Sequence, residues 1–586
     1  MKTLLNFLSS FVAALCALAA FFVFLPIAVI LIFFAAAASE SEIAPEREST
    51  CLVVNLSDQV ADSCVPADLP ARLVGEKGAI SLRSLCARIL RAGAEGKIKT
   101  LLLCGSLEDS YEPLSYAQVS ELRAALEGFK KRGGSVEAHL ENPSTRDYYL
   151  ASCASKISLN PMSELELKGI GGGAVFFGNA LKKYGVDATV VKVGKLKSFG
   201  EMFTASEMSA PVRENCMEYL GSVWSGVVSA ISKSRKIPEK TIRAAADTKA
   251  LLSAKEALDL KLVDSLEYRD ELVGRMKKIH GENSAGTFSQ TSVLRYPEKS
   301  GAGAKYVAVV YMNGDILEAS RSRSDSEISA SAFCPLIRDL RADPDCAAAV
   351  VRLNSGGGSA YASELIRREL ELFAREKPLI ASIGSCAASG AYWIATASRE
   401  IYAEPASLTG SIGVFSLLFS AKKMAGDFGI TFDAVKTSPM ADIGAISRAP
   451  TKEEIARLQK LTDDTYEKFV SLVCASRKMP REKVEPLADG RVFSGSRAKE
   501  LGLVDAEGSL ADAVSRARVL SGAKIARAEE FPKREILSDF IDAVAPLAGG
   551  DFAKSKTLKP IFEAARAAGN LKAGAYARAP FDFEIK

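Results

Sequence analysis

A serine within a run of small residues is the first feature of this sequence that could carry covalent chemistry. Residues 384–390 read Gly-Ser-Cys-Ala-Ala-Ser-Gly, between a strand predicted at residues 377–383 and an apolar segment. A strand, a tight turn and a helix in succession expose a hydroxyl at a helix N-terminus, where free amide groups favour negative charge. Ser389 is therefore a candidate nucleophile, although the same pattern also fits an ordinary serine N-cap of a buried helix.

A nucleophilic serine needs a base, and the composition limits which residue could serve. The chain has only two histidines, His139 and His280, and neither lies in a context that resembles a catalytic triad. We expect structural or surface roles for both. A lysine is the natural alternative if burial lowers its pKa towards neutrality. Lys197 lies in the segment Gly-Lys-Leu-Lys-Ser-Phe-Gly and precedes apolar residues that could bury it, although a solvated surface lysine remains the alternative.

The sequence contains two copies of one domain. Residues 148–157 match residues 392–401 at an offset of 244 positions, and two later pairs of segments match at offsets of 242 and 241. Nearly constant offsets over more than a hundred residues indicate a tandem duplication.

The two copies differ at the candidate residues. At the offset of 244, Ser389 corresponds to Thr145 in the first copy, and Lys197 corresponds to Ala441 in the second. The first copy thus has the lysine without the serine, and the second has the serine without the lysine. This complementary loss predicts one site divided over both repeats.

A glycine run supplies a further candidate in the second copy. Residues 354–359 read Asn-Ser-Gly-Gly-Gly-Ser and follow a strand predicted at residues 348–353. Glycines allow backbone N–H groups to point into a cleft without a Cβ in the way. Such donors, from Gly358 and Gly390, could hold an oxyanion. A flexible loop or a phosphate-binding turn is the alternative for the glycine run.

The pattern of the elements predicts the fold class. Short β-branched strands alternate with amphipathic helices in each copy, which favours an α/β domain with largely parallel strands. The predicted segments are an N-terminal stub and transmembrane anchor (1–44), the first repeat (45–281), a linker rich in Gly, Ser and Thr (282–304), the second repeat (305–524), and a C-terminal helical extension and tail (525–586).

The N-terminus predicts a membrane anchor. Residues 11–38 are almost entirely apolar, which is long enough to cross a bilayer. Lys2 precedes the run and acidic residues follow it, so the positive-inside rule places the N-terminus in the cytoplasm and both repeats outside. A cleaved signal peptide is the alternative, because residues 36–39 read Ala-Ala-Ala-Ser.

Charge and cysteine content exclude several other classes. The 75 basic and 71 acidic residues give a net charge of +4. This balance lacks the basic excess that is typical of nucleic-acid-binding proteins. The eleven cysteines are scattered without a CxxC motif, so we expect no metal site, and we expect no cofactor. Cys51 and Cys64 could pair in an oxidising compartment.

At these residues the sequence resembles the signal peptide peptidase A family, also called protease IV, in its long tandem-repeat form. The matching stretches are residues 194–198, 352–359, 387–393 and 408–414. The resemblance implies two tandem ClpP/crotonase-like domains built as spirals of ββα units. It also implies that Ser389 is the nucleophile, Lys197 the general base and Gly358 an oxyanion amide. One departure is Gly356, where the family usually has a proline, which should loosen the loop.

The resemblance further implies a function and a location. Members of the family form membrane-anchored bowls, described as tetramers for the long form, and degrade leftover signal peptides and other hydrophobic peptides in the bacterial envelope. We therefore expect a single-pass protein of the bacterial inner membrane, with a homo-oligomer of catalytic domains on the periplasmic side. The alternatives are a crotonase-like acyl-CoA enzyme and a catalytically inactive membrane scaffold.

Overall fold

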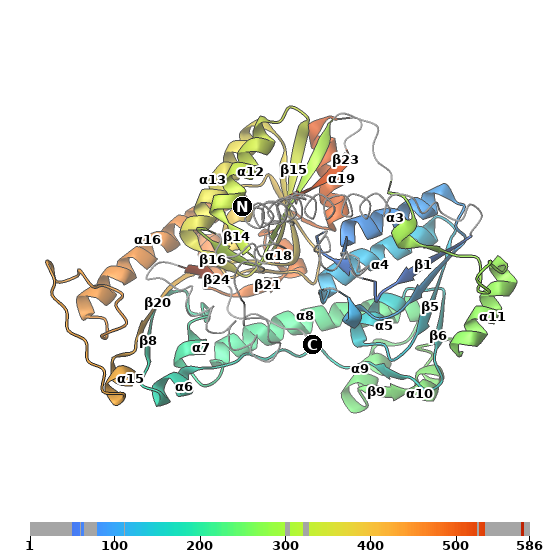
Figure 1. Ribbon diagram of the computed structural model, residues 1–586, viewed down its shortest axis with the longest axis horizontal. Helices are drawn as coiled ribbons and strands as arrows, with labels where there is room; N and C mark the ends of the chain where they lie inside the picture. Colours follow the sequence, from blue (N-terminus) through green and yellow to red (C-terminus); the bar gives the residue numbers. More distant parts are fainter. Residues whose placement is uncertain are drawn as a thin grey trace, which may run out of the picture.

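The computed structural model is a mixed α/β protein in which helices cover the faces of two main sheets (Figure 1). It describes residues 50–58, 60–63, 79–110, 112–298, 305–319, 327–523, 527–533 and 576–578. The predicted anchor at residues 11–38 lies outside the described residues, and so does Cys64. Within these described ranges, no helix combines the length and apolar character that a bilayer span requires.

The first repeat is built on a six-stranded sheet whose pairs are all parallel. Its strands are, in order across the sheet, β10 (Ser265–Leu266), β6 (Lys156–Leu159), β5 (Ser135–Leu140), β4 (Thr100–Cys104), β1 (Cys51–Asn55) and β11 (Thr291–Ser292). Alternate residues of β1 and β4 face opposite sides. One side packs against α3 (Leu82–Glu95) and α4 (Tyr116–Lys131), and the other against α11 (Arg269–His280).

The second repeat repeats this plan on an eight-stranded sheet. The main path is β21 (Val492–Ser494), β19 (Leu408–Gly410), β17 (Leu379–Ala388), β15 (Cys346–Ser355), β12 (Tyr306–Asn313) and β23 (Arg527–Phe531). Off this path, β18 (Glu400–Ala403) pairs with β17, and β22 (Ala506–Glu507) pairs with β18. Helices α12 (Ala330–Ala342) and α13 (Ala360–Glu376) cover one face, and α19 (Leu510–Ser521) covers the other. The α/β prediction is therefore correct.

The duplication is visible in equivalent contacts as well as in sequence. The hydroxyl of Tyr148 donates to the carbonyl of Leu262 at 2.8 Å in the first repeat. The hydroxyl of Tyr392 donates to the carbonyl of Leu503 at 2.7 Å in the second repeat. These pairs are related by the same offsets that relate the two sequences, so the copies share their internal packing.

Each sheet also includes a strand from outside the residues that the sequence assigned to its repeat. β11 lies within the predicted linker and pairs with β1, and β23 follows residue 524 and pairs with β12. Most of the helical extension predicted at residues 525–586 lies outside the described residues, which include strands there at residues 527–531 and 576–578.

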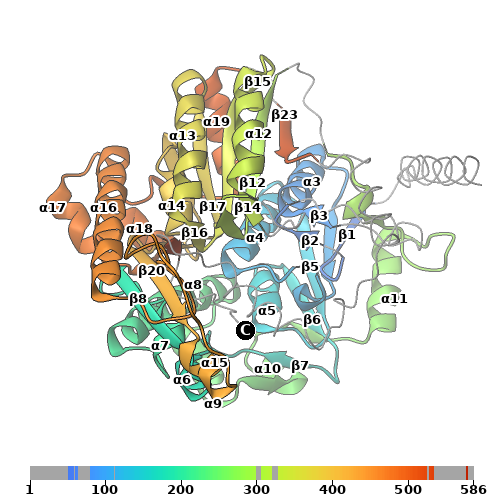
Figure 2. The same ribbon diagram turned by 60° about the vertical axis from the view of Figure 1, so that its left-hand side comes forward.

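A third sheet joins the two repeats. Its order is β14 (Glu327–Ser329), β13 (Asp315–Leu317), β16 (Gly357–Ser359), β24 (Tyr576–Arg578), β20 (Val414–Ser420) and β8 (Asp187–Val193). β8 belongs to the first repeat and runs antiparallel to β20 of the second, from Val193 opposite Val414 to Asp187 opposite Ser420 (Figure 2). This pairing places the segment that follows β8 beside the segment that precedes β20.

Candidate active site

Ser389 lies at the turn between strand β17 and helix α14 (Gly390–Ala395). Its backbone has φ 57° and ψ −115°, a conformation that a residue other than glycine adopts only when its surroundings hold it. The surroundings do so here, because its amide donates to the carbonyl of Gly410 and its carbonyl accepts from the amide of Trp393. Its side chain makes no capping hydrogen bond to α14 among the described residues, so the N-cap alternative does not describe it.

The hydroxyl of Ser389 instead faces the amine of Lys197. The Nζ atom of Lys197 lies 2.6 Å from Ser389 Oγ, and both side chains are fully buried. The structure therefore brings together two residues that stand 192 positions apart in the sequence. Burial lowers the pKa of Lys197 well below its ordinary value, because the charged ammonium loses its hydration there.

Ser411 is a third member of this cluster that the sequence analysis did not single out. The Nζ atom of Lys197 donates to the carbonyl oxygen of Ser411 at 2.9 Å and to its Oγ at 3.0 Å. Ser411 is itself fully buried and has a positive φ of 50°. Its presence in the matched stretch at residues 408–414 was a signal, but no local pattern indicated a contact with the lysine.

The loop that carries Lys197 is fixed by the second repeat. After β8, Gly194 turns the chain with φ 103°, and the amide of Leu196 donates to the carbonyl of Asp489 at 2.7 Å. Gly490 lies directly against the loop, since a Cβ at this position would approach the backbone nitrogen of Lys197 to 2.4 Å. The second repeat therefore holds both the serine and the backbone that positions the lysine.

The two predicted oxyanion glycines lie on elements in contact with each other. Gly358 is the middle residue of β16, and Gly390 is the first residue of α14, which packs against β16. Gly358 has φ 155°, and a Cβ there would lie 2.3 Å from the carbonyl oxygen of Ile316. This position accepts only glycine, because neighbouring strand β13 leaves no space for a side chain.

The two histidines lie in the first repeat, and their hydrogen bonds are to residues outside the cluster of Ser389 and Lys197. His139 in β5 bonds to Ser158 at 3.0 Å, and His280 at the end of α11 bonds to Thr50 at 2.7 Å. Burial lowers the pKa of both imidazoles. Lysine is thus the basic side chain at Ser389.

Comparison with known proteins identifies the family. The model for peptidase family S49 matches the chain twice, at residues 129–282 and 371–524. The chain belongs to peptidase family S49. Protease 4 of Salmonella typhi is 35% identical over 410 residues, which are 68% of this chain and 66% of that protein. Protease 4 of Haemophilus influenzae is 30% identical over 80% of this chain and 78% of its own length.

A plant relative extends the comparison. The chloroplastic serine protease SPPA of Arabidopsis thaliana is 28% identical over 80% of this chain and 69% of its own length. These matches confirm the resemblance to the protease IV family and identify this S49 peptidase as a serine protease. ClpP1 from Listeria monocytogenes matches 35% of the chain at 15% identity with a TM-score of 0.22. The ClpP/crotonase-like form of the repeats stays a prediction.

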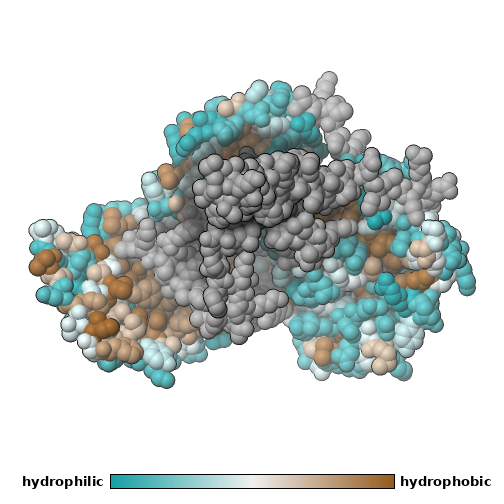
Figure 3. Space-filling view, in the orientation of Figure 1, coloured by the Kyte–Doolittle hydropathy of each residue, from teal (hydrophilic) through white to brown (hydrophobic). Residues whose placement is uncertain are grey.

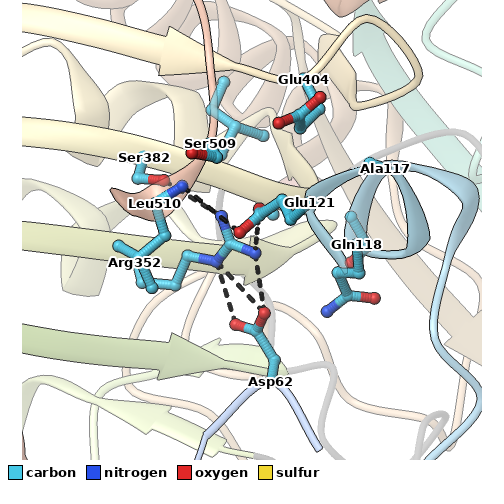
Figure 4. Close-up of polar contacts among 12 residues, drawn as sticks. Asp62, Ala117, Gln118, Glu121, Arg352, Ser382, Glu404, Ser509 and Leu510 are labelled. Atoms are coloured by element: carbon cyan, nitrogen blue, oxygen red, sulfur yellow. Dashed lines mark hydrogen bonds and ion pairs between the residues drawn. The ribbon is translucent and has the colours of Figure 1, made fainter. Parts of the chain in front are cut away.

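A buried ionic network links the S49 peptidase's two repeats (Figure 4). Arg352 of β15 is fully buried and binds two carboxylates of the first repeat, Asp62 and Glu121, each at 2.7 Å. Burial alone would raise the pKa of Asp62, but the charge of Arg352 and the hydrogen bonds to it outweigh burial and lower the pKa. Breaking such a pair leaves an uncompensated buried charge, so the network holds the repeats in one arrangement.

Through Asn354 the same network reaches the glycine run and the segment before Ser389. The Nδ2 atom of Asn354 donates to Asp62 at 2.7 Å, and its Oδ1 accepts from the amide of Ser385 at 2.7 Å. Asn354 precedes the glycine run, and Ser385 precedes the nucleophile on β17. The sequence could not show this connection, because Asp62 and Asn354 are 292 positions apart.

Glu404 is a further buried carboxyl group in the same interface, and its pKa is raised. Its side chain accepts from Ser120 of the first repeat at 2.7 Å, and it is buried beside Glu121. Burial and the charge of Glu121 raise the pKa of Glu404 to about 7, despite the opposing effects of Ser120 and Arg352. The interface therefore contains one arginine and three carboxyl groups, which are not all charged at neutral pH.

Replacement of Gly490 should reduce turnover without unfolding the protein. In Gly490→Ala the new Cβ must displace the backbone at Lys197, and a shift of about 1 Å in a catalytic group costs about 100-fold in rate. We expect kcat on a peptide substrate to fall by about 10-fold to 100-fold. Gly502→Ala is the matched control, because Gly502 also has a positive φ but an added Cβ there would meet the side chain of Met479 and not the lysine loop. Equal losses in both variants would contradict this account.

Stability should depend on pH through Glu404. An unfolded glutamate has a pKa of about 4.3. Between that pH and about pH 7, the folded state therefore binds more protons at Glu404 than the unfolded state does. This stabilisation is complete below the unfolded pKa and is lost as pH rises through 7. We expect Glu404→Gln to raise the unfolding temperature relative to the unmodified protein more at pH 8 than at pH 5. Glu507→Gln, at an exposed residue, is the control. A difference that is the same at both pH values would refute the assignment.

Proposed function

We propose that this serine protease is an endopeptidase that works with a Ser389–Lys197 dyad. The observation that carries the proposal is the 2.6 Å separation of Lys197 Nζ and Ser389 Oγ inside a fully buried cluster. Burial lowers the pKa of Lys197 well below its ordinary value, which favours the neutral amine that can accept a proton. Family membership favours this peptidase over an acyl-CoA enzyme.

The first chemical step is proton transfer from Ser389 to Lys197. The lone pair of the neutral amine takes the hydroxyl proton while Ser389 Oγ attacks the peptide carbonyl carbon. The two oxygen atoms of Ser411 then stabilise the ammonium that forms, since both already lie within 3.0 Å of Nζ. Ser411 thus orients the lysine throughout the step.

The remaining steps use the glycine amides and the same lysine. The N–H groups of Gly358 and Gly390 stabilise the tetrahedral oxyanion. The Lys197 ammonium gives its proton to the leaving amine, and the peptide bond breaks to leave an acyl ester on Ser389. Water, deprotonated by the neutral lysine, then hydrolyses the ester and restores the serine.

The proposed substrates are apolar peptides, including remnants of cleaved signal peptides. Two curated relatives carry the name protease 4, and the apolar run at residues 11–38 supports an anchor in the membrane where such remnants remain. The location proposed is the bacterial inner membrane, with both repeats on the periplasmic side. The balanced charge gives no support for nucleic acid as a partner.

A homo-oligomer is proposed because the counterparts of β8 and β20 in the duplicated sequence do not form strands in the described residues. At the offset of 244, residues 431–437 correspond to β8 and residues 170–176 correspond to β20, yet neither described segment forms a strand. Apolar side chains are exposed near the first segment, at the end of the molecule that contains α15 (Lys422–Asp427) (Figure 3). They are Phe428, Ile430, Phe432, Val435 and Ile446. Residues 431–437 of one copy would pair with residues 170–176 of the next, a head-to-tail contact that closes into a ring.

Removal of either dyad member should abolish peptide cleavage. Ser389→Ala and Lys197→Met should each lower kcat by about 1,000-fold or more, because the dyad acts as a unit. Lys195→Met is the matched control, since Lys195 lies exposed two residues away. The unmodified protein should lose activity as pH falls through the lowered pKa of Lys197, where the base becomes charged. Near-normal turnover by either dyad variant would contradict the mechanism.

A charge at the apolar loop should break the oligomer. Val435→Asp places a carboxylate on a fully exposed valine within the proposed contact. We expect light scattering of the detergent-solubilised chain to give a smaller particle than for the unmodified protein. Val519→Asp, at an exposed valine of α19, should leave the particle unchanged. The same mass for both variants and the unmodified chain would rule out this interface.

A further inference from the structure

A short stretch of the second repeat, residues 489–492, contacts the lysine loop directly. The carbonyl of Asp489 accepts from the amide of Leu196 at 2.7 Å, and Gly490 lies against the backbone of Lys197. The stretch leads into the short strand β21. Any shift of the stretch would therefore move the backbone that carries the lysine amine.

The same stretch also contacts the groups around the serine. The carbonyl of Arg491 accepts from the amide of Ser411 at 2.6 Å, and Val492 stands opposite Gly410 in the antiparallel pair of β21 and β19. The carbonyl of Gly410 accepts in turn from the amide of Ser389 at 2.8 Å. One stretch of backbone thus sets the lysine loop, Ser411 and the serine turn relative to one another.

Asn215 holds this stretch from the first repeat. It lies on helix α8 (Ala210–Arg235), which packs beside β21, and its side chain is buried (Figure 1). Its Nδ2 donates to the carbonyl of Val492 at 2.9 Å, and its Oδ1 accepts from the amide of Val492 at 2.9 Å. Since β21 is the last strand on its side of the sheet's main path, one side-chain amide here takes the place of a neighbouring strand.

Helix α8 holds the lysine loop by a second contact. Val212 and Cys216 lie on the same face of the helix as Asn215, three residues before it and one after it, and both pack with Leu196 in one buried apolar cluster. The helix therefore contacts the lysine loop through apolar side chains and the stretch at residues 489–492 through a polar one.

The two hydrogen bonds of Asn215 satisfy backbone groups that water cannot easily reach. Val492 is buried, and a buried N–H or C=O group without a partner is costly. If the amide were lost, residues 489–492 would shift to satisfy these groups elsewhere. Such a shift reaches the lysine loop and Ser411, and a displacement of about 1 Å in a catalytic group costs about 100-fold in rate.

We propose that Asn215 is a positioning residue that holds residues 489–492, and through them the amine of Lys197, in place against Ser389. This inference rests on the proposed function and deepens it, because it gives the first repeat a second contribution to the dyad. Both hydrogen bonds described for the Asn215 side chain are to Val492. The residue therefore acts through the backbone and affects proton transfer, not peptide binding.

Removal of both hydrogen bonds tests the proposal. Asn215→Leu keeps a side chain of similar size but can neither donate nor accept. We expect kcat on an internally quenched peptide of alternating leucine and alanine to fall by about 10-fold to 100-fold, while KM changes by less than about two-fold. An unchanged kcat would overturn the proposal.

Ser222→Ala is the matched control for this variant. Ser222 lies on the same helix and donates to the hydroxyl of Ser494, at the other end of the same strand, at 3.0 Å. Its loss removes a contact between α8 and β21 but leaves residues 489–492 in place, so both kcat and KM should match the unmodified chain. Equal losses of kcat in both variants would assign the effect to general packing and overturn the role of Asn215.

Asn215→Asp provides a readout that packing alone would not change. A charged carboxylate cannot donate to the carbonyl of Val492, whereas a protonated carboxyl group can donate to that carbonyl and accept from the amide, as asparagine does. The kcat of this variant, divided by that of the unmodified chain at the same pH, should therefore rise from pH 8 to pH 5. A ratio that does not change with pH would overturn the proposal.

Labelling of the serine separates this inference from the proposed function. A fluorophosphonate forms a phosphonyl ester with an activated serine and releases fluoride, and it needs no peptide substrate. Mass spectrometry should show that Ser389 is labelled more slowly in Asn215→Leu by the same factor as kcat. Labelling at the unmodified rate would refute the inference and leave the proposed function standing. If the unmodified chain is labelled but cleaves no peptide, the proposed function fails and the inference stands.

Discussion

The contact between a buried amine and a buried hydroxyl is the interaction on which the rest of this structure depends. Taking a lysine out of water disfavours its charged form, and here no carboxylate is its partner: the described contacts of Lys197 Nζ are oxygens of Ser389 and Ser411. A neutral amine at this place requires complete enclosure. Enclosure requires both repeats, because the lysine loop comes from one and its walls come from the other.

The docking of the repeats is accordingly secured at several independent places. The antiparallel pairing of β8 with β20 fixes the position of the lysine loop along the second repeat. The close approach of Gly490 to the backbone of Lys197 fixes how near the lysine loop lies to the second repeat. Arg352 and Asp62 form a buried ion pair across the same boundary, and Asn354 extends it to the glycine run and the segment before Ser389. A change in the docking would therefore alter the proposed dyad and the proposed oxyanion loop together.

Duplication explains how such a site could be divided. The copies keep the contacts that hold each domain together, such as the tyrosine hydroxyls of Tyr148 and Tyr392 on equivalent carbonyls. They differ at the proposed catalytic residues, since Ser389 has no serine counterpart in the first copy and Lys197 has no lysine counterpart in the second. The shared third sheet then brings the two halves into register. β24 lies inside that sheet, between β16 and β20 of the second repeat.

The sequence by itself determined the α/β class, the duplication, and the pair Ser389 and Lys197. These predictions follow from local hydrophobic periodicity and from the constant offsets between the two copies. Both can be read from the linear sequence. Only the tertiary structure decided that the pair meets at 2.6 Å, that Ser411 completes the cluster, and that β24 lies against the glycine strand. Those contacts join segments up to hundreds of positions apart. Contacts over such distances produce no periodic pattern in the sequence. Strand pairing between the repeats selects them.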